Sequence, residues 1–154
     1  MSNIRSTDDP GVRFAKLMAE LYYFMGQEMV AQLGEEKGKE AILAAVRKFG
    51  EARVKAMKEE ARDLGLEAHG TETYRRVRDM PGTGWKTNPE NPLEITYCPM
   101  CEAWEQFGSA GRELGYLYCQ IDHVLYGGFG VRMERPLCRA KGDGACLFLL
   151  NEKG

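Results

Sequence analysis

The sequence has little of what several common enzyme classes need. Of its 154 residues, only three are serines and two are histidines. Ser109 lies in a stretch that lacks the first glycine of a nucleophile elbow, so a serine hydrolase of that type is not expected. Two histidines cannot supply a three-histidine zinc site within one chain. A phosphate-binding P-loop and a dinucleotide-binding glycine fingerprint are also missing.

Long apolar runs and an excess of one charge are missing as well. No run approaches the roughly 18–20 apolar residues of a membrane helix. The first ten residues contain no apolar signal-peptide region, so we expect a cytoplasmic protein with reduced thiols. The net charge is −2 and both halves carry nearly balanced charges. We therefore expect no nucleic-acid partner and no membrane association.

The length favours one domain, and its first half reads as two helices. A chain of 154 residues falls within the usual range for a single domain. Asp9 and Pro10 form a helix start, apolar residues follow at helical spacing, and Gly34 is a plausible stop. A second helical pattern runs from Glu35 to Gly65. This predicts a helical first half over about 9–65.

The segment over 66–92 is rich in glycine and proline and reads as loop, with a strand expected over Thr71–Met80. Three arginines in that segment, near Trp85, fit either a solvated face or an anion site: Arg75, Arg76 and Arg78. A long loop in a small domain is often a binding loop, so Trp85 is a candidate for ligand contact.

The second half, about 71–151, mixes strands and helices. Alternation predicts a strand over Leu93–Tyr97, and a helix opens at Pro99. A further helical pattern ends at Gly127–Gly128. Strands over Val131–Leu137 and Ala145–Leu150 are joined through the favourable turn pair Asp143–Gly144. We expect a single α+β domain, with N-terminal helices packed on a C-terminal antiparallel sheet and further helices.

All five cysteines lie between 98 and 146, and the first has a distinctive position. Cys98 ends the expected strand and precedes Pro99, which makes it the residue that caps the next helix. A thiol there faces the positive end of the helix dipole and unpaired amide groups, which favour the thiolate. Glu102 follows four residues later and is a candidate proton carrier. A small buried core cysteine is the alternative interpretation of Cys98.

A second cluster is Cys119, Asp122 and His123, which share one face if the segment is helical. An acid between a thiol and an imidazole suggests chemistry, although Asp122 as a backbone cap and His123 as an ordinary polar residue remain alternatives.

The pair Cys98-x-x-Cys101 has two further interpretations. It has the spacing of a redox motif, but the two helices before the strand do not fit a thioredoxin-like fold. A zinc site could combine these thiols with others, the alternative ligand set being Cys98, Cys101, Cys119 and His123. Cys138 and Cys146 flank the last turn and each read as small buried residues.

Three short blocks in order resemble the L-2-amino-thiazoline-4-carboxylic acid hydrolase family. The first is Tyr97-Cys98-Pro99 followed by Glu102 and Trp104. The second is Tyr118-Cys119 with Asp122 and then Gly128-Phe129, and the third is Gly142-Asp143-Gly144 followed by Cys146-x-Phe148. The helices around Leu33-Gly34-Glu35-Glu36 also fit the helical first half of that family.

The resemblance implies hydrolytic opening of a thiazoline ring to an N-carbamoyl-cysteine, with no cofactor. As a hypothesis, Cys98 is the nucleophile, Asp122 and Glu102 manage protons, and Cys119 supports the site. Tyr97 and His123 are candidates for substrate contact. One arginine should hold the substrate carboxylate. The candidates are Arg112, Arg132 and Arg135, between which the sequence does not choose, and Arg132 is taken as the working candidate.

Other functions stay open at this stage. The closing hairpin also resembles vinyl-reductase-type small-molecule-binding domains, which would bind a ligand without chemistry. Cys101 and His123 are not features of the family blocks, which keeps the zinc alternative open. A small-molecule substrate is the expected partner, and the many apolar helix positions are compatible with a homodimer.

Overall fold

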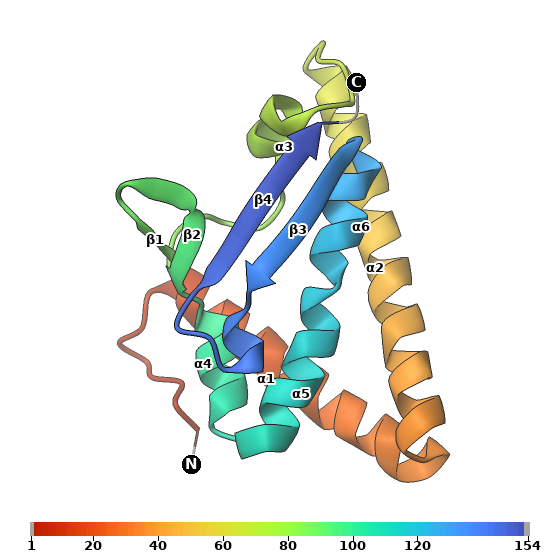
Figure 1. The fold of residues 1–154 in the computed structure, drawn as a ribbon, viewed down its shortest axis with the longest axis vertical. Helices are drawn as coiled ribbons and strands as arrows, with labels where there is room; N and C mark the ends of the chain where they lie inside the picture. Colours follow the sequence, from red (N-terminus) through yellow and green to blue (C-terminus); the bar gives the residue numbers. More distant parts are fainter. Residues whose placement is uncertain (1, 153–154) are drawn as a thin grey trace.

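The computed structural model describes residues 2–152 and begins with two long helices (Figure 1). Helix α1 spans Pro10–Leu33 and helix α2 spans Glu35–Asp63. The Asp9 carboxylate accepts a hydrogen bond from the Gly11 amide at 2.9 Å, which caps α1 as its sequence predicts. Gly34 separates the helices with a φ of +87°, a conformation that favours glycine. The expected helical first half is confirmed.

The remaining elements alternate between helix and strand. In chain order they are α3 (Thr71–Val77), β1 (Lys86–Asn88), β2 (Asn91–Tyr97), α4 (Pro99–Glu105), α5 (Gly108–Cys119), α6 (Ile121–Gly128), β3 (Val131–Leu137), a 3₁₀ turn η1 (Arg139–Lys141) and β4 (Cys146–Glu152).

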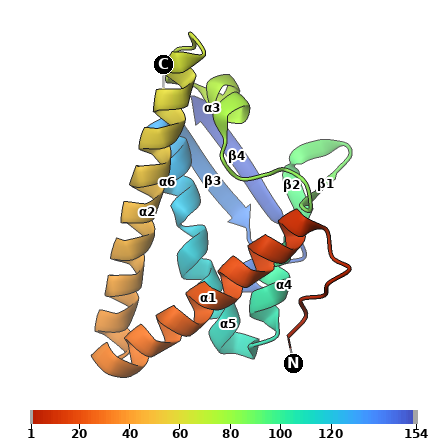
Figure 2. The ribbon, with the colours of Figure 1, turned by 180° about the vertical axis from the view of Figure 1, so that it is seen from behind.

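The four strands form one antiparallel sheet in the order β1-β2-β4-β3. Figures 1 and 2 show that α1, α2 and α6 lie on one side of β3 and β4, so that one face of the sheet is covered by helices. The expected single α+β domain with an antiparallel sheet is therefore confirmed.

Helices α4 and α5 pack closely around Trp104, one of the most buried side chains. The Trp104 indole N–H donates to the Ala19 carbonyl of α1 at 2.9 Å. A Cβ atom added at Gly115 would lie 2.4 Å from the Trp104 ring, and one at Gly111 would lie 2.0 Å from the Trp104 carbonyl oxygen. The glycines of α5 therefore permit the contact that fixes α4, and Cys98 is the residue directly before that helix.

Two local predictions are wrong. The segment Thr71–Met80 was expected to be a strand, but its first part is the helix α3. Its arginines do not alternate with apolar residues, and Val77 is instead the residue that the helix buries. The helical pattern ending at Gly128 is interrupted at Gln120, which separates α5 from α6. The short strand β1 has no clear sequence signal.

Candidate functional site

A cavity of about 650 Å³ lies between the inner face of the sheet and the helices. Its wall combines residues far apart in the sequence, from α2, α3, α4, α5, α6 and strands β2, β3 and β4. Most of the lining is apolar or aromatic, and a few charged groups and thiols converge on it. A cavity of this size and composition is typical of small-molecule sites.

Cys98 lies at the edge of this cavity, where β2 ends and α4 begins. Its backbone is extended, with φ −130° and ψ 117°, and Pro99 starts the helix. The side chain is partly exposed, whereas Cys101, Cys138 and Cys146 are buried. The sequence prediction for this junction is confirmed, and Cys98 is the more accessible thiol at the start of α4.

All five cysteines are free, and their thiols interact one after another. The Cys101 thiol interacts with those of Cys98 and Cys119, and the Cys119 thiol also interacts with that of Cys138. Cys146 interacts with Cys138 and accepts a hydrogen bond from the Arg139 amide at 3.3 Å. These interactions between thiols lower the pKa of Cys138 and raise those of Cys119 and Cys146. Thiols that are far apart in the sequence are thus neighbours at this cavity, and all but Cys138 belong to its lining.

Asp122 lines the cavity and is held by Arg135. An Arg135 N–H donates to the Asp122 carboxylate at 2.7 Å, and two donate to the Cys119 carbonyl at 3.0 Å each. The Arg135 side chain is only 4% exposed, and that of Asp122 is 28% exposed. Burial raises the pKa of the Asp122 carboxyl even though Arg135 opposes this shift. A carboxyl in a cavity with a raised pKa is suited to proton transfer.

Tyr118 presents an unused hydroxyl group next to these residues. It lines the cavity, is only 7% exposed, and its hydroxyl has no hydrogen-bond partner within residues 2–152. Burial raises the pKa of the phenol to about 12, so the hydroxyl keeps its proton at neutral pH. A buried polar group without a partner is costly, and a bound ligand would satisfy it.

A second group of positive charges lines the cavity from the side of α3. Arg53 is bound to Asp79 by two hydrogen bonds, at 2.8 and 2.6 Å. Arg75 makes only a 4.0 Å contact with Glu72, and Arg78 has no ion-pair partner among the described residues. Trp85 lines the same cavity. Arg75 and Arg78 line the cavity and are also exposed, so their placement is compatible with both interpretations of the arginine run, the solvated face and the anion site.

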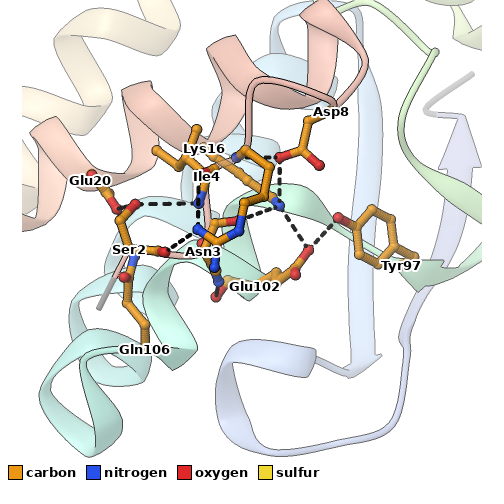
Figure 3. A network of polar contacts seen from close by, with 10 residues as sticks. Ser2, Asn3, Ile4, Asp8, Lys16, Glu20, Tyr97, Glu102 and Gln106 are labelled. Carbon is orange, nitrogen blue, oxygen red and sulfur yellow. Dashed lines mark hydrogen bonds and ion pairs between the residues drawn. The ribbon is translucent and has the colours of Figure 1, made fainter.

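Tyr97 and Glu102 lie outside the lining of the cavity, in a polar network with the N-terminal segment (Figure 3). The Tyr97 hydroxyl donates to the Glu102 carboxylate. The ammonium of Lys16, which is only 3% exposed, lies 3.4 Å from Glu102 and 3.1 Å from Asp8. The structure therefore gives Glu102 a charge partner, and it does not bring Glu102 together with Asp122.

Three other residues predicted for the site also lie away from the cavity. Arg132 is 67% exposed in its side chain and forms an ion pair with Glu134 at 2.7 Å. His123 and Arg112 are exposed on the helices and do not line the cavity.

The zinc alternative is not supported by the geometry. Within residues 2–152 no group of three or more histidine, cysteine, aspartate or glutamate side chains is arranged so that it could hold a metal ion. Since His123 is exposed and lies away from the cavity, Cys98, Cys101, Cys119 and His123 do not converge.

The alternation of buried and exposed residues in β3 indicates that Arg135, rather than Arg132, faces the cavity. Val131 and Met133 are buried on the inner face of β3, while Arg132 and Glu134 point outward. Arg135 has the same parity as the buried pair, so alternation along the strand selects it. No comparable pattern indicates Tyr118, because an aromatic residue at a buried helix position is usually core.

Comparison with known proteins supports the resemblance given by the short motifs. The family model for L-2-amino-thiazoline-4-carboxylic acid hydrolase matches residues 14–150. No curated protein and no solved structure gives a significant match. None of the helices in residues 2–152 combines the length and apolar composition needed to cross a bilayer.

Proposed function

Because the chain belongs to the L-2-amino-thiazoline-4-carboxylic acid hydrolase family, we propose that it opens the ring of such a thiazoline to give an N-carbamoyl-cysteine. One observation carries the assignment of residues: Cys98, Asp122 and the unpaired hydroxyl of Tyr118 line the same cavity. They provide a nucleophile, an acid or base and a hydrogen-bonding group in a mostly apolar site.

In the first half of the proposed reaction, the thiolate of Cys98 attacks the ring carbon between sulfur and nitrogen. A C–S bond to the protein forms, and the bond from this carbon to the ring sulfur breaks. Asp122 gives its proton to the departing sulfur, which becomes the thiol of the product. The raised pKa of Asp122 supports this role, because it increases the protonated fraction. In the resulting intermediate, the former ring carbon is bonded to the Cys98 sulfur and to two nitrogen atoms.

In the second half, one water molecule attacks the same carbon. Asp122, now a carboxylate, accepts a proton from the water. The bond to Cys98 breaks and Cys98 leaves as the thiolate that began the reaction. The second proton of the water passes to the amidine nitrogen, and the water oxygen becomes the carbonyl oxygen of the urea group. One water is consumed and no oxidant or reductant is needed. The Arg135 hydrogen bond fixes the orientation of Asp122 during both steps.

Recognition of the substrate carboxylate is assigned to Arg75 and Arg78. Both line the cavity, and neither has a strong ion-pair partner within the described residues. A planar guanidinium pairs well with a carboxylate. Tyr118 can hydrogen-bond the nitrogen atoms of the amidine. His123, Arg132, Tyr97 and Glu102 do not line the cavity, so this assignment does not use them.

Two alternatives to this mechanism can be distinguished by experiment. In one, Asp122 activates water directly and Cys98 only lines the site. In the other, the cavity binds a small molecule without catalysis, and its volume of about 650 Å³ suits either role. We also propose that the protein works in the cytoplasm, because its five cysteines are free.

Steady-state turnover of the thiazoline by four proteins separates these pathways. We expect Cys98→Ala to lower kcat by at least ~1,000-fold and Asp122→Asn by roughly 100-fold or more, in the range of a lost nucleophile or acid-base group. His123→Gln, on the exposed side of α6, serves as the matched control and should keep wild-type turnover. Substantial activity in Cys98→Ala would favour direct attack by water, and binding without turnover in the wild type would favour a ligand-binding role.

A further inference from the structure

The outward face of α1 is apolar over most of its length. Apart from Leu33 at its last position (51% exposed), its exposed large apolar side chains are Phe14 (73%), Leu17 (50%), Leu21 (61%), Phe24 (55%) and Met25 (59%). Four charged residues occur in α1, and Glu28 is the one that is exposed. Figure 2 shows α1 on the outside of the molecule, crossing in front of α4 and α5. We call Phe14, Leu17, Leu21, Phe24 and Met25 the α1 stripe.

This pattern is the opposite of what a solvent-facing helix shows. A surface helix normally carries its charged residues on the outer face. Helix α2 follows that rule, because charged residues dominate its exposed positions. Along α1, the exposed positions 14, 17, 21 and 24 follow the alternating three- and four-residue spacing of a seam that packs against another helix. Among residues 2–152, no other helix covers this seam, since its side chains are exposed.

The α1 stripe of one copy is also complementary in shape to the α1 stripe of a second copy. At the C-terminal end of the stripe, the second half of α1 carries a groove of about 510 Å³ lined by Phe24 and Met25 of the stripe and by Glu28, Met29, Gln32 and Leu33. Phe14, the most exposed side chain of the stripe, lies at the other end of α1. If two copies of α1 lie antiparallel with Leu21 at the centre, Phe14 of each copy lies over the groove of the other. Such a symmetric contact is the commonest way in which identical chains pair.

The area is sufficient for a stable pair. With about 200 Å² for a large side chain, the exposed fractions of the stripe amount to roughly 600 Å² per copy. A pair would then remove roughly 1,200 Å² from water, which is the lower end of the range for stable interfaces. A membrane surface is a poorer occupant, because lipid-binding helices flank their apolar face with Lys and Arg, whereas Arg13 and Glu20 flank this one.

We propose that the α1 stripe is a homodimer interface in which two α1 helices pack antiparallel about Leu21. The proposal is independent of the catalytic assignment, since none of the stripe residues lines the cavity. Four proteins test it by sedimentation at micromolar concentration: the wild type, Leu21→Glu, Leu21→Lys and the control Leu64→Glu. Leu64 is 55% exposed at the end of α2, which makes it comparable to the stripe residues but distant in sequence.

The wild type and Leu64→Glu should sediment with twice the chain mass of 17.3 kDa. Leu21→Glu and Leu21→Lys should each be monomeric, with dissociation constants at least ~100-fold higher, because each variant loses two buried leucines and places like charges together. An equimolar mixture of the two variants should regain the dimer, because their opposite charges meet at the axis. Two misfolded variants would not form a dimer when mixed, so this result separates a lost interface from a lost fold.

Three results would overturn the proposal: a monomeric wild type, a dimer that persists in both folded Leu21 variants, or a mixture that stays monomeric. A monomeric wild type that cosediments with anionic lipid vesicles would assign the stripe to a membrane surface instead.

Discussion

Replacing Arg135 by methionine tests whether this residue holds Asp122 at the cavity. The substitution keeps an apolar stem but removes three hydrogen bonds, one to the Asp122 carboxylate and two to the Cys119 carbonyl. Removing one partner of a buried ion pair costs about 3–5 kcal/mol. Because Asp122 is 28% exposed, we expect the lower end, a loss of about 3 kcal/mol in the free energy of unfolding.

Chemical unfolding of the wild type, Arg135→Met, Asp122→Asn and the double variant measures this loss as a double-mutant cycle. A loss of about 3 kcal/mol corresponds to a fall of roughly 6–12 °C in Tm for a domain of this size. The two residues should couple by at least ~1 kcal/mol, because they are in direct contact. A loss below about 1 kcal/mol in Arg135→Met, or purely additive effects, would contradict the pairing that the structure gives.

Four further predictions follow from the same geometry. In native reduced protein, iodoacetamide should modify Cys98 faster than the buried thiols, as peptide mass mapping would show, and equal labelling would contradict its exposure. Arg78→Gln should raise KM for the thiazoline by roughly 10-fold or more, because a charged hydrogen bond to the substrate is lost. Arg132→Gln, at an exposed position outside the cavity, should leave KM unchanged. Equal changes of KM in the two variants would refute the carboxylate site. Burial raises the folded-state pKa of Asp122, so protonation of this carboxyl stabilises the fold at low pH. This contribution is lost as the pH rises from the ordinary aspartate range through the folded-state pKa. Asp122→Asn should remove this pH dependence from the free energy of unfolding, measured by unfolding curves at a series of pH values. Gly115→Ala should lower the free energy of unfolding by about 1–3 kcal/mol, because its Cβ would lie 2.4 Å from the Trp104 ring; an unchanged Tm would mean that α4 and α5 separate easily.

Local signals in the sequence predicted the framework of the site well. Asp9 with Pro10, and Cys98 with Pro99, mark helix starts through capping and proline geometry, which act within a few residues. Both starts are where the structure has them. The two strands at the end of the chain were also predictable, because Val131 and Met133 alternate with polar residues.

Features that depend on distant contacts were harder to predict. Glu102 was expected at the site because it follows Cys98 by one helical turn, but Lys16 from α1 attracts it into the network of Figure 3. Strand alternation predicts that Arg135 faces the cavity from β3. It does not predict the partner of Arg135, because Asp122 lies on a different element, α6. Nothing local to Tyr118 indicates that its hydroxyl would remain without a partner.

The most direct test of the account is mass spectrometry of L-2-amino-thiazoline-4-carboxylate after incubation with the purified, reduced protein. The account predicts a product heavier by one water, formed by the wild type and not by Cys98→Ala. An unchanged thiazoline in the presence of folded wild-type protein would contradict the proposed hydrolysis of this substrate.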